Sequence, residues 1–240
     1  MAQINYLIYS PLGILPSLIW LLFYLKEDVR PEPKKMVLKI FFYGALIAFP
    51  VALFEIFILR IISALKFSQL LTKILENFLA IAFIEEIGKY LIIKMAVLKN
   101  KELDEPIDLM IYMIISALGF AAVENVFLAF SKKSYFALLV GRFLSATFLH
   151  ALCSGILGYF LVISFFEPKK KKIFFPSGFL LATILHGLYD FSIMEIEGNL
   201  KVLIVALILI FSATFLKMFF QRSKKLKSIC KIEQRALKTH

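Results

Sequence analysis

The sequence has few of the residues that build disulfide-stapled, zinc-ribbon or loop-rich folds. Its 240 residues include only two cysteines, Cys153 and Cys230, which lie far apart and form no CxxC or other metal-binding spacing. Glycine, with 10 residues, and proline, with 8, are sparse, and charged residues make up 19% of the chain. It also lacks the repeated segments of alternating polarity from which membrane β-barrels are built. These absences argue against a disulfide framework, a zinc ribbon and a barrel.

Hydrophobic residues are what the chain has in excess. They make up 60% of the sequence, including 26 phenylalanines, and the mean hydropathy is +0.84. Soluble domains contain about 45–50% apolar residues, so a soluble globular domain is strongly disfavoured. The composition predicts an all-α fold, a polytopic bundle of long lipid-facing helices.

The apolar stretches predict about seven transmembrane helices. Each is long enough to cross about 30 Å of hydrocarbon, which takes roughly 20 helical residues. The stretches lie at about 4–25, 37–62, 74–98, 108–130, 135–165, 173–194 and 200–220. The link at 63–73 mixes apolar and polar positions, which predicts a short interfacial helix. The first stretch lacks a basic leader and a small-residue cleavage site, so we interpret it as a retained span rather than a signal peptide.

Basic residues predict the orientation of the bundle. The formal net charge is +11, and with the N-terminus outside, twenty of the 28 Lys and Arg residues fall in inner segments and six in outer segments. Positive residues collect on the cytoplasmic side, so this count favours N-out, C-in. We therefore divide the chain into a helical bundle over 1–220 and a basic cytoplasmic tail over 221–240, which lies against anionic lipid. This explains the net charge without a nucleic-acid partner.

Ionisable residues in the middle of the third stretch are the first sign of function. Glu85, Glu86 and Lys89 lie within a run that is otherwise apolar. A charge at mid-bilayer costs at least a few kcal/mol, so such residues face a partner or a wet cavity. On a helix, Lys89 is i,i+4 from Glu85 and i,i+3 from Glu86, so one ammonium can partly neutralise both carboxylates.

The next two stretches carry further polar residues at helical spacing. Glu124 in the fourth lies i,i+4 from Phe120 and is followed by Asn125. In the fifth, Arg142 and His150 are eight residues apart, so they share one helix face, and Ser154 follows one turn later.

The sixth stretch pairs His186 with Asp190 at i,i+4. This spacing lets the carboxylate orient the imidazole and fix its tautomer. With N-out topology, the ionisable residues of these four stretches fall in overlapping layers of the middle-to-outer half of the bilayer, which predicts one wet site.

Each residue alone also has a structural interpretation. Glu55 and Arg60 in the second stretch can serve helix packing only, and a lone buried histidine is more often a hydrogen-bonded core residue than a ligand. The whole set at compatible depth is harder to explain by packing. The candidate catalytic residues are Glu85, Glu86, Lys89, Glu124, His150, His186 and Asp190.

Three short motifs resemble the signatures of a known family. EEIGK at 85–89, FAAVE at 120–124 and HGLYD at 186–190 match the EExxK, FxxxE and HxxxD patterns of the PrsW family of intramembrane proteases. Each motif alone is weak, but together, in order and on successive apolar stretches, they are specific. The segment RFLSATFLHALCSGILGY at 142–159 also looks like the histidine-bearing helix of that family. The resemblance covers the core at 76–192.

The same motifs separate the chain from a neighbouring branch. In the related CAAX prenyl endopeptidases, the second motif usually ends in His where this chain has Glu124, and the last ends in Asn where it has Asp190. The resemblance therefore implies a PrsW-type peptidase in a prokaryotic inner or plasma membrane. It also implies a membrane-bound protein substrate, with the first, site-1-type cut of an anti-sigma factor from the extracytoplasmic side as the expected reaction.

The residues fit peptide hydrolysis in the membrane. The reaction needs an activated water, a group that stabilises the oxyanion and a proton donor for the leaving amine. Either Glu85 or Glu86 can act as the base, and His186, oriented by Asp190, can stabilise the oxyanion or return the proton.

A metal-dependent variant uses some of the same side chains. Its tentative ligands are Glu86, Glu124, His150 and His186, an N/O set that suits zinc. There is no HExxH motif in the sequence to support it.

Two functions of other classes remain open on the sequence alone. Buried Glu, His and Asp residues also form the relays of proton- or ion-coupled transporters, although the chain lacks a detectable repeat. A non-catalytic membrane adaptor could bind a single-span partner through the same wet groove.

Overall fold

The protein is helical throughout the part of the chain that the computed structural model describes. That part comprises residues 2–28, 30–100, 103, 105–129, 135–166, 169 and 171–238. The helices are α1 (Ala2–Tyr24), α2 (Lys34–Ala64), α3 (Gln69–Ile74), α4 (Ile84–Ala96), α5 (Pro106–Ala129), α6 (Tyr135–Leu144), α7 (Ala146–Phe166), α8 (Lys171–Glu195) and α9 (Gly198–Lys238). A 3₁₀ turn, η1 (Leu25–Glu27), follows α1, and a π-helical segment, η2 (Leu75–Phe83), joins α3 to α4. The predicted all-α class is confirmed for these residues.

Five helical segments in the described residues are long and apolar enough to cross a membrane. They are Lys34–Ala64, Pro106–Leu128, Leu139–Phe165, Lys171–Glu195 and Gly198–Leu226. The other two predicted spans correspond to α1 and to the η2–α4 segment, which changes its helix type at Ile84 and carries the charged EEIGK motif. The total of about seven spans therefore stays a prediction.

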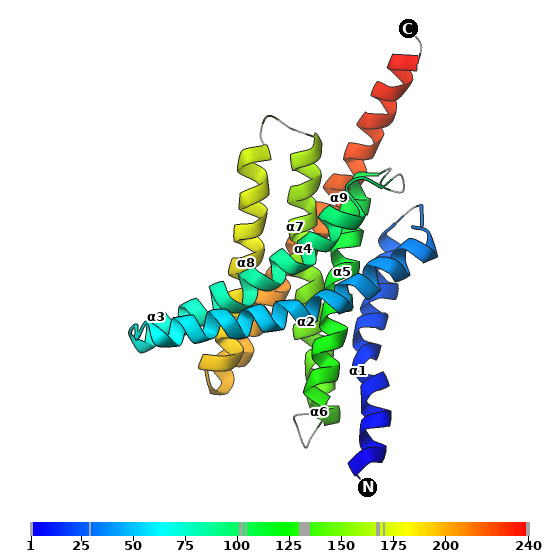
Figure 1. Ribbon diagram of the computed structural model, residues 1–240. Helices are drawn as coiled ribbons and strands as arrows, with labels where there is room; N and C mark the ends of the chain where they lie inside the picture. The colour runs from blue at the N-terminus through cyan, green and yellow to red at the C-terminus, as the bar shows by residue number, and fades with distance from the viewer. Residues whose placement is uncertain are drawn as a thin grey trace.

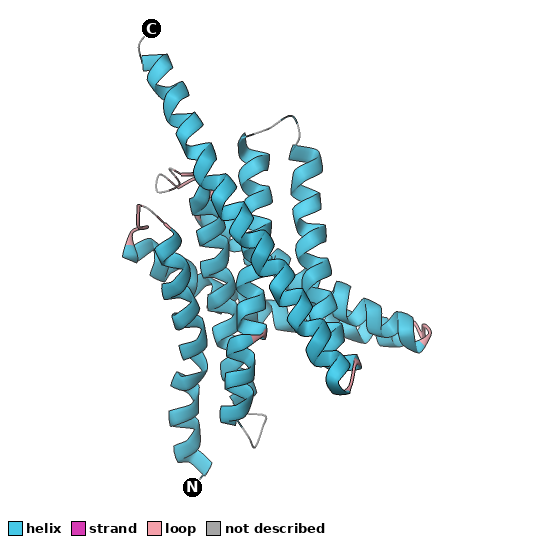
Figure 2. Ribbon diagram, turned by 180° about the vertical axis from the view of Figure 1, so that it is seen from behind, coloured by secondary structure: helices cyan, strands magenta, loops and turns pink. Residues whose placement is uncertain are grey.

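Helix α5 forms the centre of the bundle. It packs against α1, α2, α4 and α7, and almost all of its side chains are buried. A helix that is apolar on every side is stable only when other helices surround it, which is the position that α5 has. Helix α9 runs diagonally across the back of the bundle, against α7 and α8 (Figure 2).

Small residues allow α2 to cross α5 at close range. Figure 1 shows α2 lying across α5 at a steep angle. A Cβ atom at Gly44 would lie 2.1 Å from the backbone oxygen of Ser116, and one at Gly119 would lie 2.0 Å from that of Phe41. No other residue fits at either position without moving a backbone, so these glycines fix where α2 meets the core.

One predicted stretch is interrupted, and the short helix predicted in the link at 63–73 is present. The stretch at 135–165 is interrupted at Ser145, where α6 ends and α7 begins, and Trp20 Nε1 donates to the backbone oxygen of Phe143 at this break over 2.8 Å. The link at 63–73 does contain a short helix, α3, which leads directly into η2. π-Helical geometry often marks functional sites, and here it immediately precedes Glu85.

The two ends of the chain depart from opposite ends of the bundle. Helix α1 begins at one end, and α9 ends at the other (Figure 1). The predicted basic tail at 221–240 continues α9 as helix to Lys238, and 239–240 lie outside the described residues. Which end faces the cytoplasm, and whether the tail forms a unit of its own, stay predictions.

A second buried group of carboxylates joins the α1–α2 connection to the start of α5. Asp28, Glu32 and Asp108 place one oxygen each within 4.8 Å of one another. The hydroxyl of Tyr112 donates to Glu32, and the backbone N–H of Glu105 donates to Asp108 Oδ2 over 2.6 Å. These bonds tie the connection to the N-terminal turns of α5.

Candidate active site

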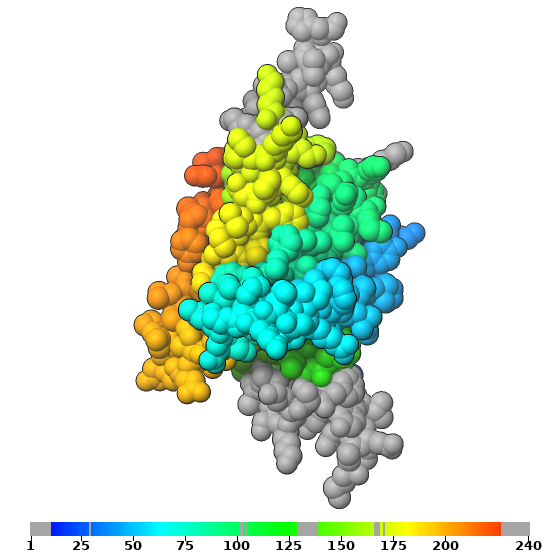
Figure 3. Space-filling model, turned by 60° about the vertical axis from the view of Figure 1, so that its left-hand side comes forward, coloured from blue at the N-terminus to red at the C-terminus, as the bar shows by residue number. Residues whose placement is uncertain are grey.

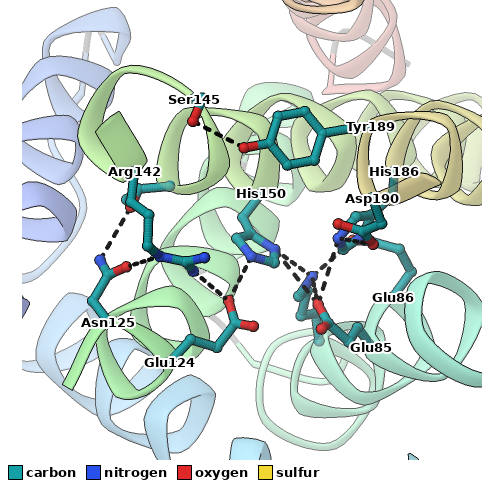
Figure 4. A network of polar contacts seen from close by, with 12 residues as sticks. Glu85, Glu86, Glu124, Asn125, Arg142, Ser145, His150, His186, Tyr189 and Asp190 are labelled. Carbon is teal, nitrogen blue, oxygen red and sulfur yellow. Dashed lines mark hydrogen bonds and ion pairs between the residues drawn. The ribbon is translucent and has the colours of Figure 1, made fainter. Parts of the chain in front are cut away.

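All seven candidate catalytic residues lie in one continuous network. They come from α4, α5, α7 and α8, which converge beside η2 (Figure 4). Each residue contacts at least one other member of the set, and the ion-pair distances between them run from 2.6 to 3.7 Å. The convergence that the sequence predicted from depth alone is therefore present in the tertiary structure.

Lys89 occupies the middle of this network. Its Nζ donates to Glu85 Oε2 over 3.0 Å and to Glu86 Oε1 over 2.8 Å, as the i,i+4 and i,i+3 spacings predict. It also lies 2.8 Å from His150 Nδ1 and 4.8 Å from the centre of the Phe120 ring. A buried ammonium is tolerated only when it is paired, and here carboxylates, an imidazole and an aromatic face surround it.

Glu86 is held on every side. Its Oε1 is 3.1 Å from His186 Nδ1 and accepts from Lys89, while its Oε2 accepts from Ser154 Oγ over 2.8 Å. Its side chain is 0% exposed. With both oxygens occupied, Glu86 is fixed as a carboxylate that orients its neighbours.

Glu85 faces both histidines through one oxygen. Its Oε2 lies 3.6 Å from His150 Nδ1 and 3.7 Å from His186 Nε2, in addition to its bond with Lys89. These separations are longer than the length of a hydrogen bond, so Glu85 and the two histidines face a common space without bonding to one another.

His150 connects the centre of the site to α5. Because its Nδ1 accepts from the Lys89 ammonium, the proton lies on Nε2, which donates to Glu124 Oε2 over 2.6 Å. Arg142 Nη2 holds the same Glu124 oxygen at 3.2 Å, and Arg142 Nε donates to Asn125 Oδ1 over 2.5 Å. Arg142 and His150 both bind Glu124, but the break at Ser145 places them on two helices, α6 and α7, and not on one continuous helix face as their spacing predicted.

His186 is the histidine that carboxylates surround. Its Nδ1 faces Glu86, and its Nε2 lies 3.4 Å from Asp190 Oδ2. A protonated imidazole can donate at both nitrogens, and this arrangement supplies an acceptor at each. The predicted pairing of His186 with Asp190 is present, and Glu86 is a second partner that the local spacing could not reveal.

Two of the seven candidate catalytic side chains reach the surface. The side chain of Glu124 is 29% exposed and that of Asp190 is 14% exposed, whereas Glu85, Glu86, Lys89 and both histidines are exposed by 4% or less. Water and a substrate therefore reach the buried groups past Glu124 and Asp190.

The donor atoms fit a metal ion, in a group that contains Glu85 in place of the predicted Glu86 and Glu124. One ligand atom each of Glu85, His150 and His186 lies within 4.8 Å of the other two, and all three residues are buried. One carboxylate and two imidazoles match the ligands of catalytic zinc. The predicted ligands Glu86 and Glu124 lie in the next layer, each bound to one of these histidines. Such carboxylates orient the histidine ligands of metal sites.

Several contributing residues carried no predicted role. Phe120 packs against the Lys89 ammonium, Ser154 anchors Glu86, and Arg142 anchors Glu124. Tyr189 Oη also donates to Ser145 Oγ over 2.9 Å, at the break between α6 and α7. Phe120 and Tyr189 lie inside the motifs, so their positions were visible in the sequence, but their partners lie on other helices.

Comparison with known proteins agrees with this geometry. The model of the PrsW family intramembrane metalloproteases matches residues 32–216. Protease PrsW of Geobacillus kaustophilus is 32% identical over 186 residues, covering 77% of this chain and 79% of the relative. Protease PrsW of Clostridioides difficile is 30% identical over 223 residues, covering 89% and 92%, and that of Bacillus subtilis is 29% identical over 188 residues, covering 78% and 83%. No solved structure matches the chain.

The match includes every helix that supplies a candidate catalytic residue, and it extends beyond the motif-bearing core to α2 and to the first part of α9, up to residue 216. Apolar helices, a buried Glu/His/Lys network and the family match agree on a membrane-embedded peptidase that acts on membrane proteins. The chain belongs to the PrsW family of intramembrane proteases.

Proposed function

We propose that Glu85 is the general base of this protease and that His186 is its proton donor. The observation that carries the proposal is the placement of Glu85 Oε2 between the two histidines, 3.6 and 3.7 Å away. Glu86, the alternative base, has both oxygens engaged by fixed partners. A base must be able to take up a proton from water. This requirement favours Glu85, because its carboxylate makes fewer hydrogen bonds than that of Glu86.

In this proposal Glu85 takes a proton from a water molecule, and the resulting hydroxide attacks the carbonyl carbon of the scissile bond. The oxyanion of the tetrahedral intermediate faces the protonated His186, which Asp190 and Glu86 hold in place. When the C–N bond breaks, His186 gives its proton to the leaving amine, and the proton that Glu85 took from water passes to His186, so both residues regain their starting states. Lys89 holds both carboxylates in position and favours the charged form of Glu85 before the reaction.

As an alternative to these proton-transfer roles, we propose that the Glu85 carboxylate and the neutral imidazoles of His150 and His186 hold a zinc ion. Zinc would supply a Lewis acid that acidifies a bound water and polarises the substrate carbonyl. Glu124 and Glu86 would orient the two histidines. The buried N/O donor set supports this part of the proposal.

The substrate and location are proposed from the family resemblance. We propose an anti-sigma factor anchored in a bacterial inner or plasma membrane, cut from the extracytoplasmic side. The predicted N-out orientation supports this side because it puts the ionisable layer in the middle-to-outer half of the bilayer.

The test is cleavage of a single-span reporter by the purified protein in liposomes. We expect Glu85→Gln to abolish cleavage and His186→Ala to reduce it strongly, while Glu197→Gln, an exposed carboxylate between α8 and α9, has no effect. Full activity of both variants would overturn the proposed roles. Capture of the reporter without any cleavage would instead indicate a membrane adaptor.

A further inference from the structure

A groove lined by apolar and polar side chains lies next to the active site, outside the network described above. It has a volume of about 490 Å³ and runs between α2, η2 and the end of α8. Its lining includes Ile56, Arg60, Ser63, Asn77, Ile81 and Met194. Figure 3 shows the face of the molecule on which α2, α3 and η2 lie across the bundle, with α8 beside them. We call it the α2–η2–α8 groove.

The walls of the α2–η2–α8 groove lead to the active site. Ile81 precedes Glu85 by four residues and Met194 follows Asp190 by four, which is about one helical turn, or roughly 6 Å along each helix axis. On the third wall, Ile56 follows Glu55, whose carboxylate is near enough to interact electrostatically with the active-site carboxylates. A chain lying in the groove would therefore enter the catalytic network directly.

An ion-pair bridge fixes the mouth of the groove. Lys73 Nζ lies 3.2 Å from Glu76 Oε2 and 3.4 Å from Glu195 Oε1, so it joins the start of η2 to the last residue of α8. Both acidic residues of the lining are thereby paired with Lys73. Arg60, on the opposite wall, has no acidic partner among the described side chains and is exposed.

A buried acceptor in the same lining also lacks a partner. Asn77 is 1% exposed, and its Nδ2 donates to the backbone oxygen of Lys73 over 2.8 Å. Its Oδ1 is buried and accepts no hydrogen bond from any described residue. Buried polar atoms are almost always satisfied, so an acceptor left open at a groove indicates a ligand that donates to it.

We propose that the α2–η2–α8 groove binds the stretch of substrate chain beside the scissile bond and selects an acidic side chain there. The substrate stretch is extended, one of its backbone N–H groups donates to Asn77 Oδ1, and its carboxylate pairs with Arg60. An extended chain advances about 3.3–3.6 Å per residue. A substrate chain that runs from the catalytic network into the groove therefore places its acidic residue roughly two to four residues from the cleaved bond. The inference rests on the proposed hydrolysis and adds the class of sequence that is cut.

The first test measures cleavage in liposomes. It uses a panel of single-span reporters that carry Asp, Ala or Lys at each position up to four residues from the cut. We expect Asp to be favoured over Lys about three- to tenfold at one position, since a charge-assisted bond to an exposed arginine is of this strength. Arg60→Glu reverses that preference. Lys66→Glu, an equal charge change in the α2–α3 turn outside the groove lining, leaves it intact.

The second test measures occupancy without catalysis. In a Glu85→Gln, Cys230→Ser background, Ser63→Cys in the groove should form a disulfide with a reporter cysteine placed beside the cut, whereas Leu203→Cys, exposed on α9, should not. Cross-linking at Ser63→Cys no stronger than at Leu203→Cys, or a charge preference that Arg60→Glu leaves unchanged, would overturn the groove assignment. Absence of all cleavage by the unmodified protein would count against hydrolysis, while the cross-linking still tests the groove.

Discussion

Two groups of buried carboxylates lie in this bundle, and they differ in what accompanies the acids. At the active site, Glu85 shares its surroundings with two imidazoles and an ammonium. Where the α1–α2 connection meets α5, the three acids Asp28, Glu32 and Asp108 lie equally close together, and their partners include a tyrosine hydroxyl and backbone N–H groups.

The positions of the two groups differ as well. The active-site acids lie within helices, where they open to the surface past Glu124 and Asp190. The other group is buried and includes Asp108 in the first turn of α5, where a negative charge favours the helix N-terminus. Proximity of acids alone therefore does not identify a catalytic site. The active site is distinguished by its imidazoles, its ammonium and its opening to the surface. The second group instead joins two parts of the fold.

Replacing the proposed base should have the largest effect and should separate the two groups most clearly. Glu85→Gln keeps the size of the side chain but cannot take up a proton, so we expect reporter cleavage to fall about 1,000-fold, within the range of general-base catalysis. The matched variant Glu32→Gln should leave cleavage by the folded protein within about twofold. Equal losses in both variants would contradict the distinction drawn above.

Metal removal should have the next largest effect. We expect a chelator to lower cleavage about 100-fold and added zinc to restore it, because the ion would acidify the attacking water. Elemental analysis should find about one zinc per chain, reduced in a His150→Ala variant and unchanged in Glu32→Gln. Cleavage that is insensitive to chelation, by protein free of metal, would refute the zinc proposal and leave the carboxylate mechanism.

Loss of the partner of His186 should have a smaller effect. Asp190→Asn keeps a polar side chain at the open edge of the site but removes its charge. Substitution of such orienting carboxylates typically costs about 10- to 100-fold, so we expect a roughly tenfold decrease in kcat with little change in KM. A change confined to KM would show that Asp190 acts on substrate binding instead.

The smallest effect on catalysis is expected in the second acidic group. Tyr112→Phe removes the hydroxyl that donates to Glu32. The free energy of unfolding in detergent should decrease by about 1–3 kcal/mol, since a buried acceptor loses a hydrogen bond. Cleavage by the folded fraction should not change. A tenfold loss of activity at unchanged stability would mean that this group communicates with the active site.

Much of the fold follows from local patterns. Most apolar stretches coincide with helices to within a few residues, although α9 continues to Lys238, well past the predicted end at about 220, and the polar link at 63–73 contains the short helix α3. The π-helical geometry of η2 and the break at Ser145 did not follow, because both depend on contacts with other helices. The steep crossing of α2 over α5 depends on two glycines, Gly44 and Gly119, that face each other's helix only after folding.

Within the site, contacts along one helix were predictable and contacts between helices were not. The bonds of Lys89 to Glu85 and Glu86 follow from i,i+3 and i,i+4 spacing. The bond from Ser154 to Glu86 joins residues 68 positions apart, and no local pattern specifies it. For this reason the sequence left the choice between the two glutamates open.

The sequence by itself determined a helical membrane protein, its family and the residue types of its active site. These properties follow from hydrophobicity and helical periodicity, which act over neighbouring residues. Only the tertiary structure decided that Glu86 is enclosed while Glu85 faces both histidines, and that Asn77 and Arg60 line one groove. Those facts depend on how helices distant in the sequence pack together, since the environment of each side chain is completed by residues from other helices.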